Sequence, residues 1–325
     1  MRQFGRFRNT GKPRRLLLGI QPIPTMVTLG NLLCGFTSIV LAMRAGHSPT
    51  LLKLKPEDYL YWSGIFIFWA MIFDIMDGKV ARWTKSASRF GMELDSLCDV
   101  VSFGAAPAVL VYALIDHELA VSAPFQNPHI HSLLSTFHDR YYILSLMAVY
   151  VCCAAMRLAR YNVEAETGHR DFFFGIPSPG AAGCVASLAV LIIPNTHHHP
   201  ISQLQNQMSA IEDLQQSLHG PVLLALPFVM MILGVLMMTR VHYPHIGDQL
   251  LRGRKSFMHV MVLGLSLVLI IIHHEIALAL AFNGYMIFGL LNEVRYQLFP
   301  SQRPAEWISA AQTTVPVPTD QKTNL

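Results

Sequence analysis

The sequence predicts an all-α integral membrane protein with about eight transmembrane helices. Hydrophobic residues make up 52% of its 325 residues and only 14% are charged, whereas soluble domains carry about 25% charged residues. Apolar runs of about 20 residues recur along the chain, and a helix of that length crosses the hydrocarbon core of a bilayer. The net charge of +4 is modest, so the composition indicates membrane lipids, and not nucleic acid, as the surroundings of the chain.

The N-terminal segment 1–22 is basic and polar and precedes the first apolar run. It lacks the short apolar core and small-residue cleavage site of a signal peptide, so we predict that the first helix, at about 23–43, is retained. Thr28, Asn31, Gly35 and Ser38 recur on this helix at helical spacing. Polar and small residues in such a stripe are expected to face neighbouring helices and not lipid.

The remaining helices are predicted from the later apolar runs. They lie at about 59–82, 91–114, 141–160, 178–194 and 221–239. The stretch 256–292 is too long for one span, and His273, His274 and Glu275 interrupt it, so we divide it into a seventh and an eighth helix. The tail 296–325 is polar and is predicted to be disordered.

Basic residues support this topology. If both termini lie in the cytoplasm, most of the 24 lysines and arginines fall in cytoplasmic segments, as the positive-inside rule requires. The exceptions are Arg44, Lys53, Lys55 and Arg140. The expected location is therefore the cytoplasmic membrane, with both termini and the acidic helix ends on the cytoplasmic side.

Four aspartates stand at fixed spacing in the second and third predicted helices. The pattern is Asp74-x2-Asp77-Gly78-x2-Ala81-Arg82, followed after eight residues by Gly91-x3-Asp95-x3-Asp99. Each group forms a stripe on one face of its helix. Acids at membrane depth are costly and usually functional, and carboxylates are the ligands that Mg²⁺ and Mn²⁺ prefer. We therefore predict that the two stripes face each other and hold a metal ion.

This motif resembles the signature of the CDP-alcohol phosphotransferase family at every position. Further segments look like its phosphatidylserine synthase branch: Pro24-x3-Thr28-x2-Asn31-x3-Gly35, the run 94–107, Arg157-Leu-Ala-Arg160-Tyr-Asn162 and 175–183. Thr25 departs from the branch, which often has asparagine after the proline. The resemblance implies a six-helix membrane core at 23–255, two additional C-terminal helices at 256–295, and a homodimer.

The resemblance also implies an activity and roles for residues. The expected reaction transfers the phosphatidyl group of CDP-diacylglycerol to the hydroxyl of L-serine, which gives phosphatidylserine and CMP. Asp74, Asp77 and Asp95 are expected to bind Mg²⁺ or Mn²⁺, and Asp99 to contribute a ligand and act as general base. The residues expected at the CDP-lipid are Gly78, Arg82, Ser88, Thr28, Asn31 and Gly91. Arg157 and Arg160 are expected at the serine carboxylate and a phosphate.

Other interpretations of these residues stay open at this point. Thr28 and Asn31 could form hydrogen bonds between helices, Gly78 and Gly91 could permit close helix packing, and the two arginines could be positive-inside anchors. A sister enzyme using inositol phosphate, glycerol phosphate or choline would share the signature. A cation transporter is the alternative from another class, but it predicts acids spread through the membrane depth.

Overall fold

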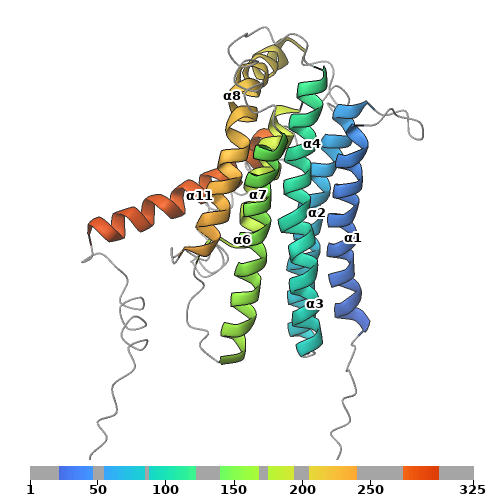
Figure 1. Cartoon of the computed structure of the whole chain (residues 1–325), viewed down its shortest axis with the longest axis vertical. Coiled ribbons are helices and arrows are strands. Elements are labelled where there is room, and N and C mark those ends of the chain that lie inside the picture. Colours follow the sequence, from blue (N-terminus) through green and yellow to red (C-terminus); the bar gives the residue numbers. More distant parts are fainter. Residues whose placement is uncertain are drawn as a thin grey trace, which may run out of the picture.

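The predicted all-α class is confirmed. The computed structural model describes residues 22–46, 55–84, 88–121, 140–167, 175–193, 205–239 and 274–299, and the regular elements within these ranges are all helices. Within these described ranges, six helical stretches are long and apolar enough to cross a membrane. Most of the helices run side by side along the long axis of the molecule (Figure 1), as expected where every backbone polar group must be satisfied within lipid.

Each predicted helix except the seventh overlaps one or more of the described helices. The elements are α1 (Pro22–Ala45), α2 (Pro56–Trp83), α3 (Arg89–Asp99), η1 (Val100–Ala105), α4 (Ala106–Val121), α6 (Arg140–Thr167), α7 (Ser178–Ile192), α8 (Gln205–Met238) and α11 (His274–Leu298). The N-terminal segment before residue 22, the predicted seventh helix from 256 and the tail from 300 lie outside the described residues.

The third predicted helix contains a change of register that the sequence did not predict. α3, η1 and α4 follow one another without a break, and η1 is a π-helical segment directly after Asp99. The hydroxyl of Tyr150 on α6 donates to the carbonyl oxygen of Phe103 at 2.9 Å. A buried donor from a neighbouring helix therefore satisfies a carbonyl within the widened turn, and such π-segments are frequently found at functional sites.

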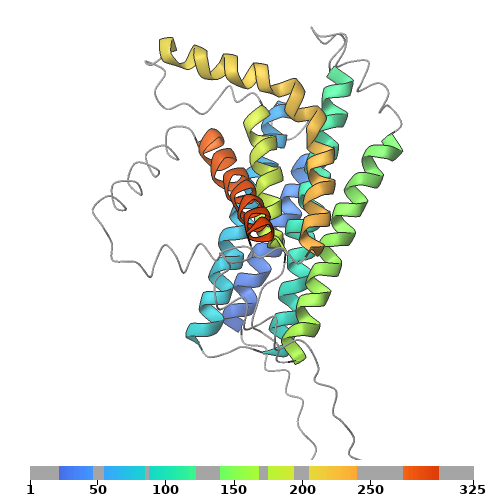
Figure 2. The same cartoon turned by 90° about the vertical axis from the view of Figure 1, so that its left-hand side faces the viewer.

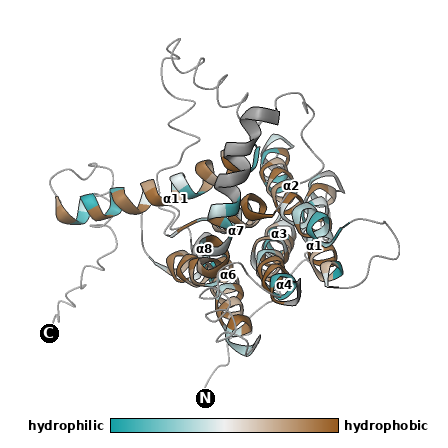
Figure 3. Cartoon of the chain, turned by 90° about the horizontal axis from the view of Figure 1, so that it is seen from above, coloured by the Kyte–Doolittle hydropathy of each residue, from teal (hydrophilic) through white to brown (hydrophobic). Residues whose placement is uncertain are grey.

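Helix α7 is shorter than the predicted fifth span. Its 15 residues rise about 22 Å, which is less than the hydrocarbon thickness of ~30 Å. It packs against α2, α4, α8 and α11 and lies at the centre of the view from above (Figure 3). Small residues such as Ala181, Ala182 and Gly183 make this crowded central position possible.

The start of the sixth helix was predicted wrongly. Helix α8 begins at Gln205 and not near 221. Its first part crosses the end of the bundle before the helix turns down along it (Figure 2). Pro221 and Pro227 lie inside the helix, and a proline there removes a backbone hydrogen bond and permits a bend. The polar start of α8 carries no hydrophobic run, which is why hydropathy alone missed it.

Helix α11 leaves the bundle obliquely (Figure 1). Its first turns are held on α7, where Asn283 Nδ2 donates to Ser187 Oγ at 3.1 Å and Cys184 Sγ donates to the Phe282 carbonyl at 3.3 Å. At its first residue, His274 pairs with the Tyr61 hydroxyl of α2. The helix ends at Leu298, so the first residues of the predicted tail 296–325 are helical.

Candidate active site

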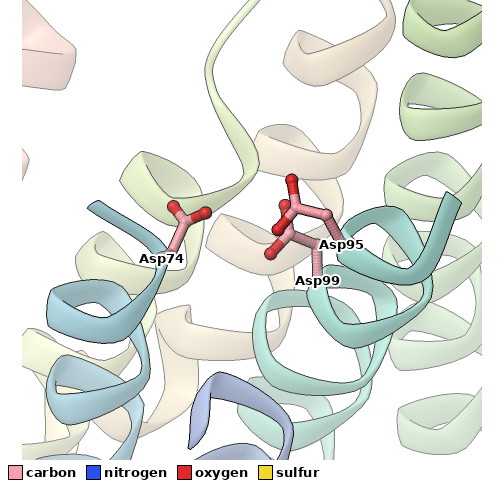
Figure 4. Close-up of side chains that lie close together, drawn as sticks. All are labelled: Asp74, Asp95 and Asp99. Atoms are coloured by element: carbon pink, nitrogen blue, oxygen red, sulfur yellow. The ribbon is translucent and has the colours of Figure 1, made fainter. Parts of the chain in front are cut away.

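The acidic motif forms one cluster between α2 and α3. Asp74 lies toward the end of α2, and Asp95 and Asp99 lie one turn apart on α3. One carboxylate oxygen from each lies within 4.8 Å of the others. Asp74 faces the other two from the opposite helix (Figure 4), so the two predicted stripes do face each other.

Asp77 lies beside this group and not within it. Its side chain is buried and close enough to Asp74 and Asp95 to interact with both electrostatically. Asp77 Oδ2 and Asp95 Oδ1 are both buried and have no hydrogen-bond donor among the described residues. Buried carboxylate oxygens without a partner are costly unless a cation or donor approaches them. This donor set therefore fits a divalent cation with oxygen ligands.

Ser88 and Gly91 build the start of α3. Ser88 is the N-cap, and its Oγ accepts a hydrogen bond from the Gly91 backbone N–H at 3.0 Å. A Cβ on residue 91 would lie 3.2 Å from this same oxygen. The cap satisfies an N–H at the helix terminus and starts the helix so that Asp95 and Asp99 point toward α2. A contact of Ser88 or Gly91 with the CDP-lipid stays a prediction.

Asn31 and Thr28 reach the aspartates from α1. The Asn31 amide nitrogen donates to Asp99 Oδ1 at 3.0 Å, so Asn31 forms the helix–helix hydrogen bond that the sequence left open. The Thr28 hydroxyl donates to the Pro24 carbonyl at 3.1 Å and lies close to Asp77. A direct contact of either residue with CDP stays a prediction.

Gly78 is exposed, and a Cβ at this position would meet no described atom within 4 Å. Close helix packing therefore does not explain this glycine in the described part of the chain. The open space beside Asp77 is where a ligand could approach the backbone of α2, as predicted for the nucleotide. Arg82 continues the same helix, but its side chain lies outside the described residues.

Substitution of Gly78 by leucine should raise the KM of the CDP-lipid by about tenfold or more, which corresponds to ~1.4 kcal/mol. Stability should not fall, because leucine has the better helix propensity and its Cβ would meet no described atom within 4 Å. Steady-state kinetics and thermal unfolding in detergent measure the two effects. Gly284→Leu is the matched control, since Gly284 on α11 is equally open. An unchanged KM in Gly78→Leu would contradict the predicted role.

Arg157 lies on α6 near the cluster. Its Nη1 donates to Ser178 Oγ at 3.0 Å, at the start of α7, and it interacts electrostatically with Asp99. Its Nε is buried without an acceptor among the described residues. Arg160, one turn later, is half-buried. The structure thus brings Arg157 to the aspartates, whereas binding of serine or phosphate by either arginine stays a prediction.

The sequence profile of the CDP-alcohol phosphatidyltransferase family matches residues 21–283. The chain belongs to this family. Three relatives, each named CDP-diacylglycerol–serine O-phosphatidyltransferase, illustrate the similarity. The protein of Helicobacter pylori strain 26695 is 29% identical over 68% of this chain and 75% of its own length. The protein of Methanocaldococcus jannaschii is 30% identical over 70% of this chain and 83% of its own length. The protein of Saccharomyces cerevisiae is 34% identical over 51% of this chain and 52% of its own length.

The range matched by the CDP-alcohol phosphatidyltransferase family includes the whole acidic motif from Asp74 to Asp99. The expected family is confirmed, and the matched range includes the first turns of α11, beyond the predicted core boundary at 255. The boundary between the core and the additional helices itself stays a prediction.

Sequence reasoning missed the hydrogen bonds that hold the helices around this CDP-alcohol phosphatidyltransferase site. Ser96 Oγ donates to Asn162 Oδ1 at 3.1 Å, and Asn162 Nδ2 donates to Glu93 Oε2 at 3.2 Å, so α3 is tied to α6. Ser178 holds Arg157 in the same way. Asn162 and Ser178 stand within the segments that resembled the family, but spacing along one helix carries no signal about a partner on another.

Proposed function

We propose that this protein transfers the phosphatidyl group of CDP-diacylglycerol to the hydroxyl of L-serine, giving phosphatidylserine and CMP. The observation that carries the proposal is the name shared by relatives from Helicobacter pylori, Saccharomyces cerevisiae and Methanocaldococcus jannaschii. The cluster of Asp74, Asp95 and Asp99 supports it, because attack of a hydroxyl oxygen on a pyrophosphate requires neutralisation of the negative charge on the phosphates.

The reaction begins with attack of the serine hydroxyl oxygen on the phosphorus that carries diacylglycerol. The new phosphorus–oxygen bond forms as the bond from this phosphorus to the bridging pyrophosphate oxygen breaks. CMP leaves with that oxygen and its electron pair, and the hydroxyl proton passes to the Asp99 carboxylate. General-base assistance of this kind contributes about 10²–10⁴-fold to a rate.

Asp74, Asp95 and Asp99, with Asp77 beside them, would hold Mg²⁺ or Mn²⁺. When bound, such an ion supplies charge stabilisation to the pyrophosphate and the leaving CMP. Gly78 leaves the α2 backbone open to the nucleotide, and Arg82 follows it on the helix as a donor fork suited to phosphate.

We place the site at the cytoplasmic face of the cytoplasmic membrane and propose a homodimer, as the family resemblance implies. The start of α1, the end of α2, the start of α3 and the end of α6 gather at one end of the bundle (Figure 1). Lys79, Arg89 and Arg160 lie toward this end, in agreement with the positive-inside rule. The lipid chains of the substrate can stay in the bilayer there while CDP faces water.

Release of CMP by the purified protein tests the function directly. CDP-diacylglycerol is supplied with serine, inositol phosphate, glycerol phosphate or choline, each with Mn²⁺ or Mg²⁺ and with EDTA. We expect turnover with serine, none of comparable rate with the other acceptors, and loss of turnover in EDTA. Turnover with another alcohol and not with serine would assign the protein to a sister activity.

Substitution of Arg157 by alanine should raise the KM of serine by about tenfold or more, because a hydrogen bond to a charged group contributes ~1.5–3 kcal/mol. Arg157→Lys should recover part of the loss, and Arg160→Ala tests the second arginine. Arg44→Ala is the control, since this exposed arginine lies at the far end of α1. Unchanged serine KM in both the Arg157 and Arg160 variants would refute an acceptor role and leave them as anchors.

A further inference from the structure

Asn31 is a neutral amide placed directly against the proposed general base. Its side chain is fully buried, and its Nδ2 donates to Asp99 Oδ1 at 3.0 Å across the contact between α1 and α3. An ionised carboxylate only accepts hydrogen bonds, so the nitrogen of the amide must be the atom that faces it. Asp99 is thus restrained by a donor from another helix.

The backbone around Asn31 is fixed by the segment that follows Asp99. Ser102 Oγ on η1 donates to the Asn31 carbonyl at 3.0 Å. One turn further along α1, a Cβ on Gly35 would lie 2.6 Å from the Ser102 Cα, so only glycine permits this approach. On the side of α2, a Cβ on Gly30 would lie 2.8 Å from Phe73. The amide and the base are therefore positioned by the same tight contact.

This hydrogen bond distinguishes Asp99 from its neighbours. Asp77 Oδ2 and Asp95 Oδ1 are buried without a donor among the described residues, which leaves those oxygens to a cation. Asp99 Oδ1 is instead engaged by a neutral donor, so its other oxygen is the one left to face the cation and the acceptor. A fixed hydrogen bond also prevents the carboxylate from rotating when a substrate enters.

We infer that Asn31 is a positioning residue that holds one oxygen of Asp99 and so presents the other to the acceptor hydroxyl. The inference rests on the proposed function, because it takes Asp99 as the base of that reaction. It differs from the prediction that Asn31 binds the CDP-lipid, and the two roles have different kinetic signatures. Loss of a positioning contact lowers kcat, whereas loss of a substrate contact made equally before and during reaction raises KM.

The test compares Asn31→Ala with wild-type protein in CMP release with CDP-diacylglycerol and serine. We expect kcat to fall about 10–100-fold, the range for loss of a supporting hydrogen bond, with the KM of CDP-diacylglycerol unchanged. Mn²⁺ affinity, followed by electron paramagnetic resonance without substrate, should fall less than kcat, because Asp74 and Asp95 still hold the ion. Asn31→Ser, which retains a donor, should recover part of kcat. If Asn31→Ala cannot be purified, Asn31→Leu, which has a similar volume and no hydrogen-bond donor, takes its place with the same expected changes in kcat and KM.

The control is Ser38→Ala. Ser38 on α1 forms a different buried hydrogen bond, to Ser63 on α2 at 2.9 Å, and its removal should leave kcat unchanged. A raised KM with kcat retained, unchanged kinetics, or an equal loss in Ser38→Ala would each overturn the inference. Absence of turnover by wild-type protein with serine would instead refute the proposed function. The same comparison would then be made with whichever alcohol is turned over.

Discussion

Asp95→Asn should lower CMP release by roughly 10²–10⁴-fold. The change weakens binding of the metal ion, whose stabilisation of the transition state is worth several kcal/mol, and about 1.36 kcal/mol corresponds to a factor of ten in rate. Asp95 faces Asp74 and Asp99, and its Oδ1 is buried without a donor among the described residues. Asparagine keeps the size of the side chain and removes its charge. Mn²⁺ binding, measured by electron paramagnetic resonance on the purified protein, should weaken in parallel with the rate.

Metal-free stability separates this effect from misfolding. Four neighbouring carboxylates repel one another in the absence of a cation, so the Asp95→Asn protein in EDTA should be at least as stable as the wild type. Glu93→Gln is the matched control, since Glu93 lies on the same helix but is exposed and pairs with Asn162. Mn²⁺ affinity at the wild-type level in Asp95→Asn would remove Asp95 from the predicted metal site.

The sequence predicted those parts of the fold that depend on local pattern. Apolar runs located α1, α2, α6 and α11 because each helix must satisfy its own backbone in lipid. Three features had no such local signal. The polar start of α8 crosses the bundle end, α7 is too short to span alone, and η1 changes hydrogen-bond register where Tyr150 of α6 reaches the Phe103 carbonyl.

The candidate site divides in the same way. Helical spacing predicted that Asp74 would meet Asp95 and Asp99, and the structure brings these three together. The structure places Asp77 beside this group and not within it. Asp77 lies less than one helical turn from Asp74, and spacing along the sequence cannot show which of the two enters the group. The bond from Asn31 to Asp99 joins residues 68 positions apart. It depends on the close approach of α1 to η1 at Gly35, which is a property of packing between helices.

Asp99→Asn is expected to lower kcat by about 10²–10⁴-fold, the contribution of a general base, while CDP-diacylglycerol still binds. The geometry should persist, because Asn31 can donate to the amide oxygen of the new side chain as it does to Asp99 Oδ1. What is lost is the ability to take the proton of the serine hydroxyl. Single-turnover CMP release and binding of CDP-diacylglycerol to the same purified protein measure the two properties separately.

The comparison variant is Asp58→Asn, which alters another buried aspartate at the opposite end of α2. Asp58 accepts a hydrogen bond from the Lys55 backbone N–H at 3.1 Å, and asparagine keeps an acceptor oxygen for it. The change removes only a negative charge from the first turn of the helix, which contributes about 0.3–1 kcal/mol to stability, and should leave kcat intact. Retained turnover in Asp99→Asn would contradict the role of Asp99 as base. Loss of CDP-diacylglycerol binding together with turnover would instead place Asp99 among the residues that hold the substrate through a shared cation. The position of Asp99 in the cluster permits two roles, general base and metal ligand. Measuring turnover and CDP-diacylglycerol binding separately distinguishes these two roles.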